Sequence, residues 1–536
     1  MKKSSNDTSG IFVVEFLLKT ETWHEHRIDK IMNILTDYYR QKQRFLLAKY
    51  NEYLATTEEG KALTETIKER ESVFSNTSST EEDKKAVCNK VNTARKAFHN
   101  LLNGIKYETA NYGYFSKMGC YMHFSNSNHK NTATRKMLDE HGINSSIKEY
   151  LGKDCAGSAW DKKLKTNNKD IKIDVNKTVN MFKSRKKSGS IVGFRFSTVE
   201  HTITMTDIKS KNGTPMTIPF IVNPKSVYEK EALEKEVRCI AIVRKQIRGN
   251  NKYYVQFTFA GHPCNKGRNM GLGTLSIDPS LCQIITLSID KNICRTYSLA
   301  DTVTEDVKKI NKLQRMLDSI RRTENPDNYN LDGTIKNQAK LVWKESDRYK
   351  MLKCKLADMW RKYAVKRKIC HNKLANELIA NYNIFKVEKN SYKSMQARSK
   401  EIKKDKNGRC LSKKRYGKSI KNHAPSMFFE ILKNKVGHYQ EGKYIEVPTG
   451  SGCTAYDFTN GEFTKHNVNE RTIRTSDGQL HDRDAHATFN IYYYKETKES
   501  KKKVQKSKEN FDNVAMKAAY HKFMTLEAPL LAAKKI

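Results

Sequence analysis

Three short stretches of the sequence carry acidic side chains that could act together. Asp278 follows an apolar, β-rich run at 275–277, and Glu388 ends a similar run at 384–387. In the third stretch, Asp482 and Asp484 precede small and apolar residues that continue to Ile491 and predict the start of a helix. Carboxylate oxygens suit Mg²⁺, and two such ions stabilise both oxygens of an in-line phosphoryl displacement. Acids on two strands and a helix could therefore hold divalent metal, whereas a helix cap or a surface charge is the alternative for each.

The charge balance indicates a polyanionic partner. Among 536 residues, Lys and Arg number 100 and Asp and Glu number 59, which gives a formal net charge of +41. Such an excess is typical of nucleic-acid-binding proteins, and the alternative, a merely soluble surface, would be served as well by charges near balance. The length predicts about three or four domains.

Cysteine usage and the N-terminal segment indicate the compartment. The eleven cysteines form no CxxC pair, and their odd number favours a reduced, intracellular protein over a disulfide framework. The apolar segment Ile11–Leu18 is too short to span a membrane and contains Glu15. We therefore expect a soluble, cytoplasmic protein without a membrane partner.

The first half of the chain changes from a strand to helices and then to β-type sequence. Ile11–Leu18 predicts a strand, and helical spacing of apolar residues continues, with interruptions, through 161–182. The basic run 183–187 then leads into a series of strands that includes 191–196, which predicts a small barrel or sandwich. We expect the first strand to join this sheet. The helical region is either a bundle that packs only on itself or, given its Lys-rich faces, a lobe that grips nucleic acid. The predicted boundaries are 1–22 for the segment with the first strand, 23–182 for the helical region and 183–267 for the β-rich region.

The second half predicts the order β-β-β-α-β-α-β-α. Strands are expected at 274–278, 283–288 and 294–299, followed by a helix from about Thr302 and a second from 346 to 381. The strand with Glu388, a helix at 424–439, a strand at 443–447 and the helix with Asp484 complete an order that is ribonuclease H-like. The domain boundaries are 268–448 and 481–498, with an insert at 449–480 and a basic tail at 499–536 that includes a helix from Asn510 to Met524.

Three motifs on these elements resemble the RuvC nuclease of transposon-associated TnpB proteins and compact type V CRISPR effectors. They are 276–280 around Asp278, 370–378 leading to Glu388, and 469–471 followed by 481–484. The resemblance covers roughly 273–494, and it implies a RuvC α/β nuclease domain beside a barrel-like wedge domain with an inserted helical recognition lobe. It implies that Asp278, Glu388 and Asp484 form a catalytic triad that binds Mg²⁺ or Mn²⁺, with Asp482 as a helix N-cap or second-shell residue.

The chain departs from this family at several positions. His486 stands where the family has Asn, and Ser276 and Ser280 replace glycines. Of the four cysteines of the family's zinc ribbon, only Cys453 remains, and one thiolate cannot form a four-ligand site even if His466 or His481 contributed. We therefore expect no zinc, and an insert held by packing or by nucleic acid. The other three positions hold Tyr456, Arg474 and Asp477, and the packing residues would be Tyr456, Phe458 and Phe463.

These observations predict an RNA-guided DNA endonuclease of the type V kind, a Mg²⁺-dependent phosphodiester hydrolase that cuts double-stranded target DNA at one RuvC site. Alternatives are a TnpB-type nuclease of a transposon, a guided DNA-binding repressor without cleavage, and a resolvase without guide RNA. The partners are a guide RNA and target DNA, with a homodimer on one guide RNA as an alternative to a monomer. The expected nucleic-acid-binding residues are Lys183, Arg185, Lys186, Lys187, Lys413, Lys414, Arg415 and Arg471.

Overall fold

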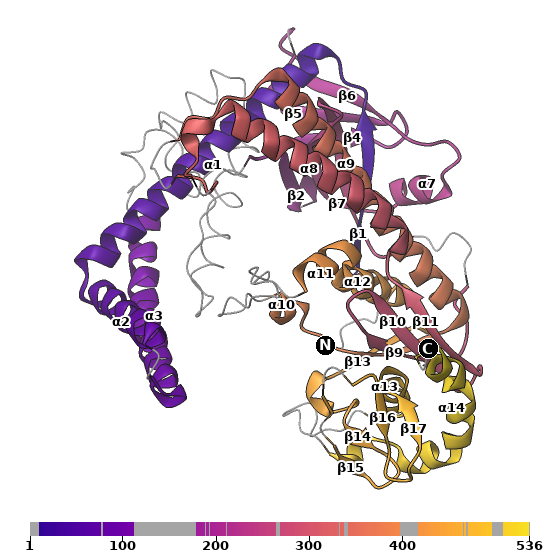
Figure 1. Cartoon of the computed structure of the whole chain (residues 1–536). Coiled ribbons are helices and arrows are strands. Elements are labelled where there is room, and N and C mark those ends of the chain that lie inside the picture. The colour runs from indigo at the N-terminus through magenta and orange to yellow at the C-terminus, as the bar shows by residue number, and fades with distance from the viewer. Residues whose placement is uncertain are drawn as a thin grey trace, which may run out of the picture. The chain divides into compact units, whose positions relative to one another are not determined.

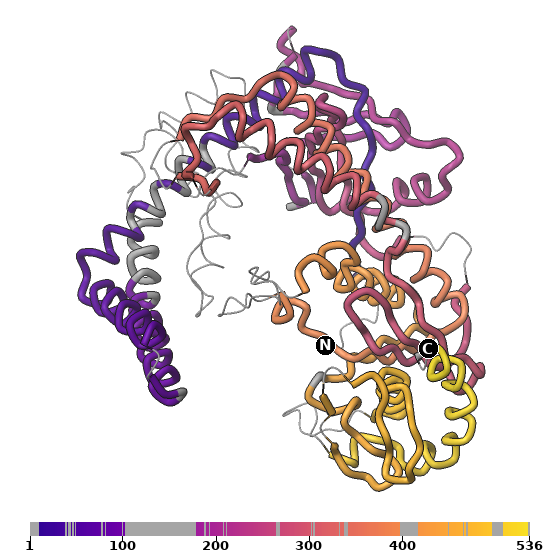
Figure 2. The backbone as a smooth tube through the Cα atoms, in the orientation of Figure 1, coloured from indigo at the N-terminus to yellow at the C-terminus, as the bar shows by residue number. Residues whose placement is uncertain are grey.

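The chain forms two compact units, Met1–Cys264 and Asn265–Ile536. The computed structural model describes residues 10–76, 79–111, 178–187, 189–191, 193–210, 212–263, 269–331, 333–336, 341–396, 416–464, 466–467, 470–495 and 507–534 (Figures 1 and 2). Within these ranges no helix combines the length and apolar character needed to cross a bilayer. Each unit has its own sheet and its own hydrophobic core.

Unit 1 is built around an eight-stranded sheet with the order β3-β2-β7-β8-β1-β6-β5-β4. The first strand, β1 (Ile11–Leu18), lies antiparallel between β8 and β6, so the N-terminal strand is internal to the sheet. In Figure 1 it is the indigo strand among magenta ones. The other strands are β2 (Met181–Lys187), β3 (Ser190–Ile191), β4 (Phe194–Ser197), β5 (Thr202–Lys209), β6 (Pro215–Ile221), β7 (Val237–Ile247) and β8 (Asn250–Ala260).

The two edges of this sheet, β3 and β4, are only two residues apart in the sequence, which makes the sheet nearly closed and barrel-like. The sequence-based prediction of one strand over 191–196 is wrong here. Gly193 has φ of +82°, a conformation that glycine adopts without a steric penalty, and it separates β3 from β4. The barrel or sandwich prediction therefore holds for the sheet as a whole, while its closure depends on a turn that the strand pattern concealed.

Helix α1 (Thr22–Thr56) follows β1 and packs its apolar stripe into the core of this sheet. Ile28, Ile31 and Leu35 are fully or almost fully buried, in the same cluster as Phe16 of β1. Helices α2 (Glu58–Ser75) and α3 (Glu81–Asn111) form a separate small core, and α7 (Val227–Leu233) precedes β7. The helix predicted for 161–182 is wrong at its end, because Met181 and Phe182 belong to β2 together with the basic run; residues 112–177 lie outside the described ranges.

Unit 2 contains a five-stranded sheet with the order β11-β10-β9-β12-β13. The strands β9 (Thr274–Pro279), β10 (Gln283–Ser288) and β11 (Ile293–Ser298) are antiparallel neighbours, whereas β12 (Ile384–Glu388) is parallel to both β9 and β13 (Lys443–Val447). Helices α8 (Thr304–Glu324) and α9 (Asp347–Asn381) connect β11 to β12. The connection from β12 to β13 contains α10 (Tyr392–Met395), α11 (Gly417–His423) and α12 (Pro425–Val436).

Helices cover both faces of the unit 2 sheet. Apolar residues of α9 and α12 pack with the buried residues of β9 and β12, among them Ile277 and Phe385. On the other face, α13 (Arg483–Tyr492) contacts β9, β10 and β12, and nearly all its residues are buried. Single 3₁₀ turns lie at Asp301–Val303, Pro326–Asn328, Thr449–Ser451 and Lys508–Asn510.

Two short hairpins and the last helix form a second core next to α13. The hairpins are β14 (Tyr456–Asp457) with β15 (Glu462–Phe463), and β16 (Thr472–Arg474) with β17 (Leu480–Asp482). Residues from 499 onward, which the sequence suggested as a basic tail, include α14 (Asn513–Lys534), whose Met516 and Phe523 are fully buried in this core. Figure 2 shows this yellow helix folded against the rest of the unit, so the C-terminal end is part of the domain.

Candidate active site

Two of the predicted acids lie at the same edge of the unit 2 sheet. Because β9 and β12 are parallel and Ile277 pairs with Val387, the next residues, Asp278 and Glu388, follow at neighbouring strand ends. The third acid, Asp484, is in the first turn of α13, which packs across these strands. Asp278, Glu388 and Asp484 together line one cavity of about 470 Å³. The topology therefore brings the three acids of the sequence prediction to one place.

The charges of these acids interact. The pKa of Asp278 is raised well above its ordinary value, mainly by burial and then by the negative charges of Glu388 and Asp484. Burial also raises the pKa of Glu388 to about 7. Carboxylates that repel each other in a partly dry cavity are stabilised by a nearby cation, because the cation removes both the repulsion and part of the desolvation cost. The site is therefore electrostatically prepared for positive charge.

Asp482 and Asp484 have different roles although they are only two residues apart. Asp482 is the N-cap of α13, and its Oδ1 accepts hydrogen bonds from the backbone N–H groups of Asp484, at 3.0 Å, and Ala485, at 2.9 Å. The N-cap expectation for Asp482 is thus confirmed. The Asp484 carboxylate faces the cavity, where its Oδ1 accepts from Arg483 Nε at 2.9 Å and from Nη2 at 2.7 Å. Arg471 Nη1 lies 3.9 Å from Oδ2.

The donor set fits a hard divalent cation, although the side chains as they stand do not yet enclose one. Three carboxylates supply the oxygen ligands that Mg²⁺ and Mn²⁺ prefer. Among the described residues, however, no three His, Cys, Asp or Glu side chains are arranged closely enough to coordinate an ion. In this arrangement the Arg483 guanidinium makes two hydrogen bonds to Asp484. Asp484 would have to exchange this contact for the cation.

Several polar residues of the cavity escaped the sequence analysis. Asn390 Nδ2 donates to the carbonyl of Pro279, at the end of β9, at 2.8 Å. Tyr392 lines the same cavity, and burial raises the pKa of its hydroxyl. Arg483 is the guanidinium that touches Asp484. Their position in the sequence could have indicated Asn390 and Tyr392, since both follow within four residues of Glu388, where a strand ends. Loops at strand ends commonly carry functional side chains.

The residues predicted to bind nucleic acid are distributed over both units. Lys183, Arg185 and Lys186 lie on β2 of unit 1, where Arg185 is exposed and Lys186 Nζ pairs with Glu236 at 2.7 Å. Arg471 lies at the cavity of unit 2 with 63% of its side chain exposed. Lys187 is the last residue of β2. Lys413, Lys414 and Arg415 lie outside the described residues.

The insert at 449–480 is held by aromatic packing. Tyr456 is fully buried, stacks on Phe511 with ring centroids 4.2 Å apart, and donates its hydroxyl proton to Asn513 Oδ1. Phe458 packs edge-on against Phe489. The packing expectation is therefore confirmed for Tyr456 and Phe458, and half-buried Phe463 contacts the same cluster.

His486, which stands where the family has Asn, lies inside this aromatic core. It is almost completely buried, its ring stacks on Phe458, and burial lowers its pKa to about 3, so the ring is neutral. The amide of Asn490, one turn later, donates to the carbonyls of Cys453, at 2.7 Å, and Tyr456, at 2.8 Å. The structure thus accounts for His486 as a neutral aromatic packing residue, with Asn490 making the polar link to the insert.

We expect purified protein to contain no stoichiometric zinc. Cys453 is fully buried, burial raises the pKa of its thiol, and Ser451 Oγ lies 3.3 Å from its sulfur. A neutral thiol without other cysteines is a poor zinc ligand. Metal analysis by mass spectrometry should find no stoichiometric zinc in the wild type or in Cys453→Ala. One tightly bound zinc per chain that disappears in Cys453→Ala would contradict this.

The raised pKa of Glu388 predicts a pH dependence of stability without metal. The folded pKa, about 7, exceeds the ordinary value of 4.5, so the contribution of this group to stability is complete below about pH 4.5 and is lost as the pH rises through 7. Urea denaturation in EDTA should therefore show lower stability at pH 8 than at pH 5, and Glu388→Gln should reduce this difference. Mg²⁺ should recover stability at pH 8 much more than at pH 5, where protons compete for the carboxylates. A larger Mg²⁺ effect at pH 5 would be the opposite of this expectation.

No protein-family model matches the sequence, and no curated protein matches it. Solved structures do match. A Cas12f1–sgRNA–target DNA complex is 12% identical, with 90% of this chain and 98% of that chain covered and a TM-score of 0.43. The mini-RNA-guided endonuclease CRISPR-Cas_phi3 is 13% identical over 90% of this chain and 92% of that chain, with a TM-score of 0.31. A Cas12i1 R-loop complex is 10% identical over 96% of this chain and 64% of that chain, with a TM-score of 0.27. These are type V CRISPR effectors, the group that the sequence motifs resemble.

Proposed function

We propose that the chain is an RNA-guided DNA endonuclease of the compact type V kind, with a ribonuclease H-like RuvC nuclease in unit 2. The observation that carries the proposal is the cavity lined by Asp278, Glu388 and Asp484, which come from β9, β12 and α13. The sheet order supports it, because three antiparallel strands followed by two parallel ones, with acids at the ends of the first and fourth, is the ribonuclease H-like arrangement.

The cavity residues divide the work of phosphodiester hydrolysis. Asp278, Glu388 and Asp484 would hold Mg²⁺ or Mn²⁺, which supplies charge stabilisation for both oxygens of the in-line displacement. Asn390 and Tyr392 keep the chain after Asp278 in position. Arg471, largely exposed at the rim of the cavity, is suited to contact a phosphate of the DNA backbone. Arg483 would turn from Asp484 toward the same phosphate.

Unit 1 is suited to hold the guide RNA. Its barrel-like sheet carries the basic run of β2 with Arg185 exposed, and the net charge of the whole chain, +41, suits a polyanionic partner. Phosphate contacts by Arg and Lys supply affinity without reading sequence, so sequence recognition would come from pairing between guide RNA and DNA.

A specific observation favours a second candidate function, guided DNA binding without cleavage. Arg483 makes two hydrogen bonds to Asp484, and no described group of acids already encloses an ion. If this pairing persists when DNA is bound, Asp484 Oδ1 stays bonded to Arg483 and the arginine charge competes with metal at this carboxylate. The protein would then be a guided repressor.

The experiment that separates these functions begins with RNA that co-purifies with the protein. This RNA is sequenced, its spacer is replaced by a chosen sequence, and the complex is incubated with Mg²⁺ and linear DNA that matches the spacer and carries randomised flanks. We expect cutting of matching DNA only. Binding to matching DNA without cutting would support the repressor, and the absence of any bound RNA would overturn the guided function altogether.

A further inference from the structure

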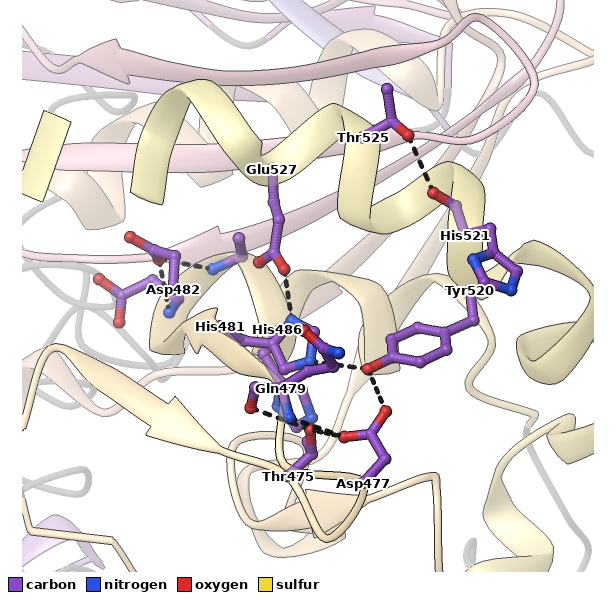
Figure 3. Close-up of polar contacts among 12 residues, drawn as sticks. Thr475, Asp477, Gln479, His481, Asp482, His486, Tyr520, His521, Thr525 and Glu527 are labelled. Atoms are coloured by element: carbon purple, nitrogen blue, oxygen red, sulfur yellow. Dashed lines mark hydrogen bonds and ion pairs between the residues drawn. The ribbon is translucent and has the colours of Figure 1, made fainter. Parts of the chain in front are cut away.

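A buried polar cluster joins the C-terminal helix to the strand before α13 (Figure 3). His481 of β17 is completely buried, and Tyr520 and Glu527 of α14 lie on either side of its ring. The ring Nδ1 contacts Glu527 Oε1, and the ring Nε2 lies 3.0 Å from the Tyr520 hydroxyl. Residues seven apart share one face of a helix, so a single face of α14 holds both nitrogens of this histidine.

The hydrogen-bond pattern fixes the direction of the contacts. Tyr520 donates its hydroxyl proton to Asp477 Oδ2 at 2.6 Å, so its oxygen can only accept from His481 Nε2–H. Asp477 lies in the turn of the hairpin β16–β17, where its Oδ1 accepts from the Thr475 hydroxyl at 2.6 Å. The remaining proton is shared between His481 Nδ1 and the Glu527 carboxylate. The ring can therefore not rotate without breaking contacts to α14 on both sides.

The histidine of this cluster lies three residues before Asp484 of the cavity. His481 is followed by Asp482, whose carboxylate caps α13, and then by Arg483 and Asp484. Asp482 pairs with Thr472 across the hairpin, and Arg483 N–H donates to the Arg471 carbonyl at 3.0 Å. Any movement of β17 would therefore move the first turn of α13, which carries Arg483 and Asp484.

The cluster is better suited to fixing geometry than to adding stability. Buried ion pairs seldom stabilise a fold more than apolar side chains of similar volume do. Glu527 is 2% exposed, and its Oε2 has no hydrogen-bond partner among the described residues. An apolar residue at this position would pack as well against Phe523 and its neighbours in the same core. What an apolar residue cannot do is hold the His481 ring at one angle.

We propose that Glu527 and Tyr520 are positioning residues, which act through His481 and the Asp482 cap to hold Asp484 at the metal-binding cavity. This inference rests on the proposed function, and it assigns to the C-terminal helix a part in the nuclease site. The helix lies outside the three motifs that carry the family resemblance.

The test uses Glu527→Met and Tyr520→Phe in the full-length protein. Both changes keep side-chain volume and remove contacts to His481. Because each leaves a buried polar partner unpaired, thermal unfolding is measured in parallel and the loss of stability is compared with that of a control variant. Mn²⁺ affinity, measured by calorimetry without nucleic acid, should fall by about 10-fold or more, and the Mg²⁺ concentration for half-maximal cleavage should rise by a similar factor, as for other residues that orient metal ligands.

Met516→Ala is the matched control. Met516 is fully buried in the same core of α14 but is not among the residues of the cluster, so its truncation should lower the unfolding temperature without changing Mn²⁺ affinity. The positioning role is wrong if the two cluster variants bind Mn²⁺ as the wild type does. It is also wrong if Met516→Ala loses as much Mn²⁺ affinity as they do for the same loss of stability. A wild-type protein that binds Mn²⁺ at Asp278 but cuts no guided DNA would disprove the proposed function, while the Mn²⁺ affinities would still decide the role of Glu527.

Discussion

Replacing Asp278, Glu388 or Asp484 with alanine is expected to lower guided DNA cleavage by at least ~10³-fold, in the range found when catalytic groups that act as a unit are removed. Each acid comes from a different element, and all three line the same cavity. Removing one carboxylate removes metal ligands and also the charge that stabilises a bound cation. Guided DNA binding should persist, because phosphate contacts by Lys and Arg supply most of the affinity. Cleavage is measured under single-turnover conditions, and binding by gel shift with the same RNA.

Asp482→Ala is the internal control for this series. It removes the N-cap of α13 and should cost about 1 kcal/mol of unfolding free energy, with a much smaller loss of cleavage than Asp484→Ala. If Asp484→Ala cut at the wild-type rate while Asp482→Ala did not, the assignment of the metal ligand within this motif would be reversed. If all four variants cut normally, the cavity would not be the nuclease site.

RNA binding is expected to depend steeply on salt. For a protein that contacts roughly six to ten phosphates, affinity falls by about 10³ to 10⁵ between 50 and 200 mM salt, because neutralised phosphates release their counterions. From the net charge of +41 we expect an RNA contact of this size. Fluorescence anisotropy with labelled guide RNA at a series of KCl concentrations gives the slope. Affinity that changes less than about tenfold over this range would contradict an electrostatic interface.

Two neighbouring residues of β2 provide a matched pair for the same measurement. Arg185 is exposed, whereas the Lys186 ammonium is already paired with Glu236 at 2.7 Å. Arg185→Ala should weaken RNA binding and reduce the salt slope by about one, the value for one lost phosphate contact. Lys186→Ala should have a smaller effect, since the Lys186 ammonium is already engaged by Glu236, which keeps Arg238 at 3.1 Å as a second partner. Equal effects of the two changes would indicate that the ion pair opens when RNA binds.

The parts of unit 2 that follow from local patterns were predictable from the sequence. The helix predicted for 346–381 is α9 at Asp347–Asn381, because its apolar spacing and its Ser346 cap are both local signals. Asp482 as a cap follows in the same way from an acid before a helical run. The choice of Asp278, Glu388 and Asp484 rests on strand ends and family motifs, and the sheet register brings them to one cavity.

Other features depend on contacts between distant residues and could not be read from local patterns. The break at Gly193 separates two β-type runs that look continuous, and only pairing with β2 and β5 shows where each belongs. Helix α14 continues past Pro529 because its buried side chains pack on α13 and β17. The two hydrogen bonds from Arg483 Nε and Nη2 to Asp484 Oδ1 are a choice of side-chain conformation, which residue order does not specify.

The internal position of β1 has a consequence for synthesis of the protein on the ribosome. Ile11–Leu18 is synthesised well before its longest pairing partner, β8 (Asn250–Ala260), which emerges only after the helical region and six other strands. Until then the nascent chain carries a strand with an apolar face, Phe12, Val14 and Phe16, and two open edges. Bringing such distant segments together is slow, because loop closure must precede the contacts that reward it. A translational pause before Asn250 would thus prolong the aggregation-prone state of this chain, whereas a pause after β8 has emerged would let unit 1 fold before unit 2 is made.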